Sequence, residues 1–328
     1  MAETAATCRA YWATAPFEGE LREAPLPPPG RGEARVRTRF SGVSRGTEAL
    51  VARGDVPPGE AMRMRCPFQA GAFPFPVKYG YAAVGTVEAG PDDLLGCTVF
   101  CLHPHQDRFV VPADALRPLP KGLPPGRAVL APNMETALNA VWDAGIGPGE
   151  RVAVLGAGVV GLLVAHLAAA IPGTELYLAD PDMGKAGAAA VLGLRLSSPA
   201  DLDGLEADRV LDCTGSPEAP AQALALAGFE AEITLVGWLG TAAASLPLGG
   251  AFHGRRLALR ASQVGAVSPG RRPRWDHARR LDKALDLLLD PRLDALISGE
   301  TPFAALPETM PRLVRNASGV LCHRIVYA

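Results

Sequence analysis

The residues with the clearest chemical potential form a glycine-rich segment in the middle of the chain. Gly156-Ala-Gly158-Val-Val-Gly161 lies between the apolar runs Arg151–Leu155 and Val159–Ala170, a pattern that predicts a strand, a tight turn and a helix. In that context the first glycine permits the turn, the second lets a pyrophosphate approach the backbone, and the third allows close packing of helix on strand. The free N–H groups of the helix N-terminus would face the phosphates. We therefore predict a dinucleotide site at Gly156, Gly158, Val159, Val160 and Gly161.

An acidic residue ends the next predicted strand. Asp180 follows Glu175–Ala179, about twenty residues after the last glycine, where a carboxylate can accept both hydroxyls of an adenosine ribose. The same carboxylate would repel a 2′-phosphate, so we expect NAD(H) in preference to NADP(H). An ordinary loop with a capping aspartate is the alternative. The combination of strand, glycines, helix and acid favours the nucleotide site.

A second group of residues has metal-ligating side chains. Cys97, Cys101, His103 and His105 lie close together in the sequence, and the last three would share one face of an extended strand. Ligands placed in this way are spread over about 13 Å, too far apart for one tetrahedral ion unless the chain bends. We therefore expect no metal here.

The elements that must position the glycine-rich segment alternate between strand and helix. The predicted strands are Arg151–Leu155, Glu175–Ala179, Arg209–Asp212, Glu232–Val236 and Leu257–Arg260, and the predicted helices are 159–170, 184–192 and 218–227. Such alternation predicts a parallel sheet with helices on both faces. The chain before it has short β-like runs between prolines and glycines, which indicates a small barrel-like unit. After it come a helix at 276–289 and a final strand at 320–327. The predicted domains are residues 1–132, 133–268 and 269–328.

Composition excludes several classes of protein. The chain has 328 residues, of which 48% are hydrophobic and 20% charged, so a large core can form and disorder is not expected. A net charge of −2 argues against a nucleic-acid partner. No apolar run is long enough to span a membrane, and the first ten residues lack a secretory signal, so we expect a cytoplasmic protein. The six cysteines form no CxxC pair and are expected to be reduced.

Taken together, these features resemble the medium-chain dehydrogenase/reductase superfamily, nearly from end to end. The matching segments are Pro29–Glu33, Ser41–Glu48, Gly147–Gly158, Asp212–Gly215, Leu235–Trp238 and Arg260–Gln263. Ser44–Glu48 and Ser262–Gly265 are similar to the branch that contains bacteriochlorophyllide hydroxyethyl dehydrogenase. The resemblance implies a GroES-like β-barrel catalytic domain, a Rossmann doubly wound parallel-sheet domain inserted before its last part, a cleft between them, and a homodimer.

The resemblance also implies roles along the cofactor. Arg45 would meet the pyrophosphate, Thr136 would lie near the nicotinamide, and Asp180 and Lys185 would hold the adenosine ribose. The residues implied at the strand ends are Thr214, Gly237, Trp238 and Ser262. Each has an alternative: Arg45 and Lys185 as solvent-facing charges, Thr136 as a helix cap, and Trp238 as a packing aromatic.

The positions that hold zinc in many relatives carry other residues here. By the resemblance, Ser44 stands in place of a cysteine, Tyr81 in place of a histidine, and Pro132 near the third ligand. The lobe with four cysteines is missing as well. We therefore predict a site without zinc.

Hydride transfer at a carbinol carbon without zinc needs a hydrogen-bond donor for the developing alkoxide. Tyr81 is the first candidate, with Lys78 lowering its pKa, and His103 is a second because it can relay a proton near neutral pH. Ser44, Asn133 and Glu135 lie in segments that the resemblance brings to the cleft. Tyr81 as a barrel aromatic and His103 as a core histidine are the alternatives.

These expectations lead to one main function and two alternatives. The long segment Ala52–Pro76 is rich in proline, glycine and phenylalanine, typical of a wall beside a bulky, partly apolar substrate, although surface packing would explain it too. We expect an NAD(H)-dependent oxidoreductase that interconverts a bulky secondary alcohol and a ketone. A zinc-free reductase of polarised C=C bonds and a non-catalytic NAD-binding protein are the alternatives.

Overall fold

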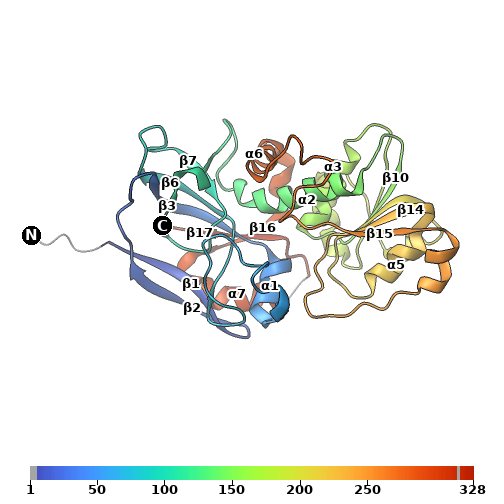
Figure 1. Ribbon diagram of the computed structural model, residues 1–328, viewed down its shortest axis with the longest axis horizontal. Coiled ribbons are helices and arrows are strands. Elements are labelled where there is room, and N and C mark those ends of the chain that lie inside the picture. The colour runs from blue at the N-terminus through green and yellow to red at the C-terminus, as the bar shows by residue number, and fades with distance from the viewer. Residues whose placement is uncertain (1–5, 316–317) are drawn as a thin grey trace, which may run out of the picture. The chain divides into compact units, whose positions relative to one another are not determined.

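The computed structural model describes residues 6–315 and 318–328, and the chain folds as two compact units (Figure 1). The first, here called the barrel unit, comprises residues 1–132 and 285–328. The second, the Rossmann unit, comprises residues 133–284. The fold is therefore α/β, with a GroES-like β-barrel and a doubly wound parallel sheet inserted before the last part of the barrel.

The Rossmann unit extends further along the sequence than the prediction of residues 133–268. Its last element, helix α6 (His277–Leu287), is fastened to helix α2 (Ala131–Ala144) by a buried ion pair between Arg280 and Glu135. Arg280 also donates to the backbone carbonyl of Val264 at 2.5 Å. These contacts keep the segment up to Ala284 with the Rossmann unit, and no local sequence pattern marks them.

The sheet of the Rossmann unit has six parallel strands in the order β12-β11-β10-β13-β14-β15. The strands are β10 (Arg151–Leu155), β11 (Glu175–Ala179), β12 (Leu196–Ser197), β13 (Ala207–Asp212), β14 (Ala227–Leu235) and β15 (Ala258–Ala261). The helices between them are α3 (Val159–Ala169), α4 (Ala186–Val191) and α5 (Ala219–Leu226). The predicted strands are confirmed to within a few residues, apart from β14, which begins earlier.

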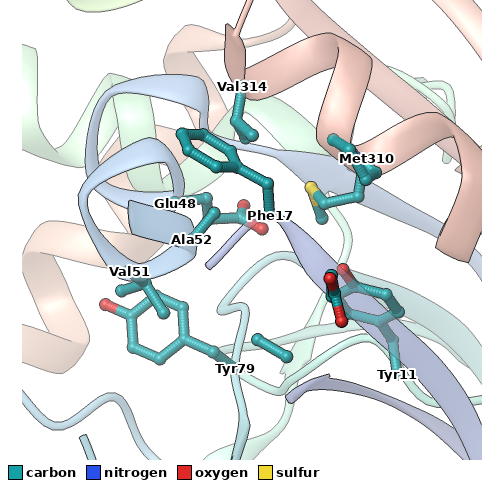
Figure 2. A pocket seen from close by; sticks show the side chains of 11 residues that line it. Tyr11, Phe17, Glu48, Val51, Ala52, Tyr79, Met310 and Val314 are labelled. Atoms are coloured by element: carbon teal, nitrogen blue, oxygen red, sulfur yellow. The ribbon is translucent and has the colours of Figure 1, made fainter. Parts of the chain in front are cut away.

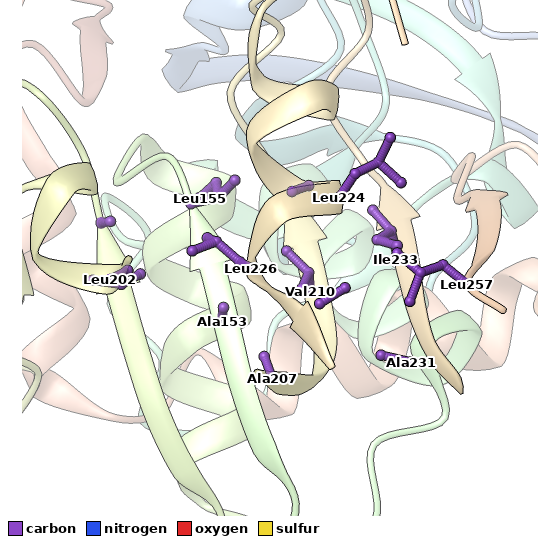
Figure 3. Close-up of a cluster of buried hydrophobic side chains, with 13 residues drawn as sticks. Ala153, Leu155, Leu202, Ala207, Val210, Leu224, Leu226, Ala231, Ile233 and Leu257 are labelled. Carbon is purple, nitrogen blue, oxygen red and sulfur yellow. The ribbon is translucent and has the colours of Figure 1, made fainter. Parts of the chain in front are cut away.

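Both faces of this sheet are buried. On one face Ala153, Leu155, Val210 and Ile233 pack with Leu224 and Leu226 of α5 in one hydrophobic cluster (Figure 3). Val152 and Val154, which point to the opposite face of β10, have no exposed surface either. A near-continuous apolar run such as Val-Ala-Val-Leu is what a parallel strand covered on both faces requires.

Two sheets make up the barrel unit. The smaller has the order β2-β1-β5-β4, and the larger β16-β17-β3-β6-β7-β9, with β8 also paired to β3. The strands are β1 (Thr7–Ala15), β2 (Glu18–Pro25), β3 (Glu33–Val43), β4 (Ala70–Gly71), β5 (Val77–Lys78), β6 (Ala83–Ala89), β7 (Thr98–Cys101), β8 (Arg108–Pro112), β9 (Arg117–Pro118), β16 (Ile297–Pro302) and β17 (Cys322–Val326). The unit's helices are α1 (Arg45–Arg53) and α7 (Leu306–Arg315). Its last strand, β17, pairs with β3, so the end of the chain completes the barrel.

Two simpler expectations can be compared with the structure directly. All six cysteines are free thiols, and Cys8, Cys66, Cys101 and Cys322 are buried. Within residues 6–315 and 318–328, the helices are all too short or too polar to cross a membrane.

Candidate functional site

The glycine-rich turn has the geometry that its sequence predicts. Gly156 has a φ of +93°, a backbone conformation that side chains disfavour. A Cβ on Gly161 would collide with the carbonyl oxygen of Gly156, so the absence of a side chain lets α3 pack directly on the turn. At Gly158, the residue before α3, a Cβ would meet no protein atom within 4 Å. The turn is therefore closed on the protein side and open at Gly158, where the N-terminus of α3 begins with Val159 and Val160.

This arrangement fits a dinucleotide. The first N–H groups of a helix have no partner within the helix, and they attract anions. At α3 no acidic side chain occupies the first turn. Gly158 has no side chain, so the space in front of its backbone is open and a phosphate can approach the backbone closely.

Asp180 and Lys185 lie together beside the turn. Oδ2 of Asp180 accepts hydrogen bonds from the backbone N–H of Ala157 at 2.7 Å and from Nζ of Lys185 at 2.8 Å, and Oδ1 accepts from the N–H of Asp182 at 2.8 Å. Both side chains are buried. The carboxylate therefore fixes the glycine-rich turn to the end of β11. Because Lys185 offsets its charge, Asp180 repels a 2′-phosphate less strongly than an isolated carboxylate would.

The remaining predicted cofactor residues of the Rossmann unit lie at its strand ends or on α2. Thr214 donates its backbone N–H and its hydroxyl to Oδ1 of Asp212, at 2.9 and 2.7 Å. A Cβ on Gly237 would collide with the backbone of Gly215, so the turns that carry Thr214 and Trp238 touch. Ser262 instead donates its hydroxyl to Asp143 of α2 at 2.7 Å, and Thr136 is half-buried on that helix. Thr214, Gly237 and Trp238 thus gather at neighbouring strand ends, whereas the hydroxyl of Ser262 has a structural partner in Asp143.

In the barrel unit, the structure brings Ser44 and Tyr81 into contact. Ser44 is the residue before α1, and Arg45 and Thr47 lie in the first turn of that helix. Ser44 and Thr47 hydrogen-bond to the phenol of Tyr81 through their side chains. Burial, and next the negative charge of Glu48, raise the pKa of Tyr81 above its usual value. Tyr81 is therefore a protonated phenol at neutral pH, suited to donating a hydrogen bond and unsuited to acting as a base.

Lys78 does not assist Tyr81 as predicted. Its Nζ donates to Oε1 of Gln106 at 2.8 Å. Burial lowers the pKa of Lys78, and its charge acts on Cys8, Cys66 and His103. The pKa of Tyr81 is raised rather than lowered, which contradicts the role that we predicted for Lys78.

His103 is packed as a core aromatic. Its ring stacks on Phe109 with centroids 3.8 Å apart, and Phe68 lies on it at 5.5 Å. Burial lowers the pKa of His103 to about 3, so the ring is neutral in the physiological range. The structure therefore argues against the predicted proton relay near neutral pH. Phe68 of the Ala52–Pro76 segment packs on this ring, so at least this phenylalanine has a packing role.

Glu135 also has a structural partner. Its Oε1 accepts from Nε of Arg280 at 3.0 Å, and both side chains are buried. Burial raises the pKa of Glu135, whereas Arg280 lowers it. The ion pair joins α2 to α6 within the Rossmann unit, so Glu135 is not free to transfer protons. Asn133, two residues earlier on α2, is buried as well.

The cysteines and histidines after β6 do not form a cluster. Strand β7 ends at Cys101, so the extended strand that we assumed through His105 is wrong. His103 stacks on Phe109, and His105 points to Glu48 and Ser41. Among residues 6–315 and 318–328, no three His, Cys, Asp or Glu side chains are close enough together to hold a metal ion.

Sequence reasoning missed a buried hydrogen-bonded chain beside Ser44. It joins Tyr327, Ser41, His105 and Glu48, and Glu48 in turn binds the backbone N–H of Ser44 at 2.7 Å. In the sequence, Glu48 stands at the end of the Ser44–Glu48 segment, and His105 is one of the candidate metal ligands. Neither position indicates that the side chains of Glu48 and His105 meet.

Comparison with known proteins supports the fold. No protein-family model matches the chain. Among solved structures, it is similar to a short chain alcohol dehydrogenase (RspB) of Escherichia coli CFT073 complexed with NADH, with 16% identity, a TM-score of 0.77, and coverage of 98% of this chain and 99% of that one. L-Idonate 5-dehydrogenase of E. coli K-12 has 16% identity, a TM-score of 0.80 and 98% coverage of both chains. A thermostable alcohol dehydrogenase of Pyrobaculum aerophilum has 22% identity, a TM-score of 0.75, and coverage of 98% and 100%. The match therefore includes both units.

Proposed function

We propose that the chain is an NAD(H)-dependent oxidoreductase that interconverts a bulky secondary alcohol and a ketone without catalytic zinc. The observation that carries the proposal is the glycine-rich turn, open at Gly158 and tied to Asp180. The similar E. coli protein complexed with NADH, L-idonate 5-dehydrogenase and the alcohol dehydrogenase of P. aerophilum support the coarser part of the proposal, a nicotinamide-dependent dehydrogenase.

In this proposal the Rossmann unit holds the cofactor, which supplies or accepts the hydride when bound. The backbone at Gly158 and the first turn of α3 would hold the pyrophosphate, and Asp180 with Lys185 would hold the adenosine ribose. Three of the four lone-pair sites of the Asp180 carboxylate have partners, so one site on Oδ1 is left for a ribose hydroxyl.

Tyr81 would supply the proton. A phenol whose pKa is raised holds its proton at neutral pH and can donate it as negative charge develops on the carbonyl oxygen. Ser44 and Thr47 hydrogen-bond to the phenol and so stabilise the phenolate that forms when the proton leaves.

The absence of zinc from the proposal rests on side-chain chemistry. Ser44, Tyr81 and Pro132 stand where the resemblance places ligands, and a hydroxyl, a protonated phenol and a proline are poor ligands for Zn²⁺. Metal analysis of the purified protein should find well under one zinc per chain. About one tightly held ion, with activity lost on chelation, would contradict this part of the proposal.

The decisive experiment measures NADH oxidation with a panel of bulky ketones. Tyr81→Phe should lower kcat by about 10²- to 10³-fold, because a donor to a developing oxyanion has about that effect, with NADH affinity unchanged. Tyr79→Phe is the matched control, since Tyr79 is a neighbouring buried tyrosine whose ring meets that of Tyr81 edge-on at 5.9 Å.

Other outcomes separate the alternatives. Reduction of activated C=C bonds in place of ketones would favour an enoyl- or quinone-type reductase. NADH binding without turnover on either panel would favour a non-catalytic protein. Full activity of Tyr81→Phe would place the donor elsewhere. A homodimer, which the resemblance implies, stays a prediction for solution measurement.

A further inference from the structure

The buried chain beside Ser44 is a continuous series of hydrogen bonds. His105 lies at its centre, with Nε2 at 3.0 Å from Oε2 of Glu48 and Nδ1 at 2.7 Å from Oγ of Ser41. Oγ of Ser41 lies 2.9 Å from the phenol of Tyr327. A carboxylate only accepts, so Nε2 of His105 donates to Glu48. The hydroxyls of Ser41 and Tyr327 continue the chain from Nδ1, and each can donate or accept.

The chain reaches the proposed proton donor along two routes. On the first route, Oε1 of Glu48 accepts from the backbone N–H of Ser44, whose side chain binds Tyr81. On the second, His105 packs on the residue before Tyr81. Gly80 has a φ of +119°, and a Cβ there would lie only 2.8 Å from Cδ2 of His105.

The backbone of His105 extends these connections to further strands. Its N–H donates to the carbonyl of Tyr79 at 3.4 Å, and its carbonyl accepts from the N–H of Tyr11 on β1 at 2.9 Å. His105 therefore joins α1, β1, β3 and the segment that leads into Tyr81.

The carboxylate of Glu48 is held by the side chain of His105 and by the backbone N–H of Ser44. Glu48 also lines a small cavity, with room for about one water molecule, whose walls include the apolar side chains of Phe17 and Met310 and the phenols of Tyr11 and Tyr79 (Figure 2). A buried carboxylate that loses a donor must shift toward another donor or draw in water. A change at His105 should therefore move Glu48, and with it Ser44.

We propose that Glu48, oriented by His105 at the centre of the buried chain Tyr327–Ser41–His105–Glu48, positions Ser44 and Tyr81 for reaction, with His105 as the central positioning residue. The inference rests on the proposed function for the reaction itself. His105 is 1% exposed and Glu48 5% exposed, so neither touches a substrate, and both act through Ser44 and the Tyr79–Tyr81 segment. In this protein, a network of hydrogen bonds orders the segments that the resemblance places around zinc in relatives.

Two substitutions of His105 separate its two contacts. The amide of Gln places a donor near the position of Nε2, whereas the shorter Asn places its amide near Nδ1. His105→Gln therefore keeps the contact to Glu48, and His105→Asn keeps the contact to Ser41. We expect His105→Asn to lower kcat for ketone reduction by about 10- to 100-fold, since small displacements of reacting groups have effects of that size. His105→Gln should stay within about threefold of the unmodified protein, and NADH affinity should be unchanged in both.

The control is another histidine that bonds to a hydroxyl in the same unit. The side chain of His323 on β17 lies 2.7 Å from Oγ1 of Thr301, and it is not a member of the hydrogen-bonded chain Tyr327–Ser41–His105–Glu48, so His323→Gln should keep the full kcat. If His105→Asn does not fold, Glu48→Gln takes its place. That variant keeps the shape of the side chain but leaves one oxygen to accept from both Ser44 and His105, and it should lower kcat similarly.

Crystal structures of the variants give a readout that does not depend on activity. The hydroxyls of Ser44 and Tyr81 should be displaced in His105→Asn and in place in His105→Gln. Equal kcat values for the two variants, or unmoved hydroxyls in His105→Asn, would overturn the inference. If the unmodified protein reduces no ketone, the proposed function fails. The crystal structures then decide by themselves whether His105 and Glu48 position Ser44 and Tyr81.

Discussion

Replacing Gly158 by alanine should separate cofactor binding from folding. The residue has a φ of −69° and a ψ of 178°, a conformation that alanine adopts without strain. Its added methyl group would meet no protein atom within 4 Å. The methyl group would instead occupy the space in front of α3 that the proposed function assigns to the pyrophosphate.

The magnitudes of the two effects differ. Gly→Ala at a compatible position stabilises by about 0.4–1 kcal/mol through the unfolded state, and the poorer capping by alanine offsets part of this. The free energy of unfolding should thus change by less than about 1 kcal/mol. Loss of one charge-assisted hydrogen bond to a phosphate costs about 1.5–3 kcal/mol. Since 1.4 kcal/mol is a factor of ten, the Kd for NADH should rise by about 10- to 100-fold.

Fluorescence titration with NADH and thermal unfolding measure the two effects on the same samples. Gly161→Ala is the contrasting variant, because its Cβ would collide with the carbonyl oxygen of Gly156 and should lower the stability itself. Gly59→Ala is the neutral control, since a Cβ there also meets nothing and it lies in the barrel unit. A folded Gly158→Ala protein with the NADH affinity of the unmodified chain would refute the assignment of the pyrophosphate site.

Three further predictions concern charge. The unmodified protein should bind NADH at least about tenfold more tightly than NADPH, and Asp180→Ala should reduce this difference in Kd. Equal Kd values for the two cofactors in the unmodified protein would contradict the preference for NAD(H). Because the pKa of His103 is lowered to about 3 in the folded state and lies near 6.5 in the unfolded chain, the unfolded state binds more protons between these values. Stability should fall on acidification below about pH 6.5, by up to about 1.4 kcal/mol per pH unit from this group, and denaturant titrations of His103→Phe should show a shallower fall. Arg280→Met should destabilise the protein by about 3–5 kcal/mol by leaving Glu135 buried without its partner, and a double variant with Glu135→Met should recover most of the loss, which chemical denaturation can measure.

The sequence by itself was sufficient where local chemistry decides the structure. The glycines at 156 and 161 are required by a positive φ and by a close approach within a few residues, so their spacing predicts the turn directly. The strands of the parallel sheet are short apolar runs because both faces are buried, and their bounds follow from composition. The α/β class and the order of the two folds therefore follow from the printed residues.

Only the tertiary structure decided which partner each polar side chain of the site takes. His103 and His105 are two residues apart, yet one stacks between aromatic rings and the other binds Glu48 and Ser41. Glu135 is paired with Arg280, far away in the sequence. A buried polar group must find a partner, but several elements can bring one, and the sequence does not say which element passes closest. The partners of the proposed proton donor therefore had to be read from the fold.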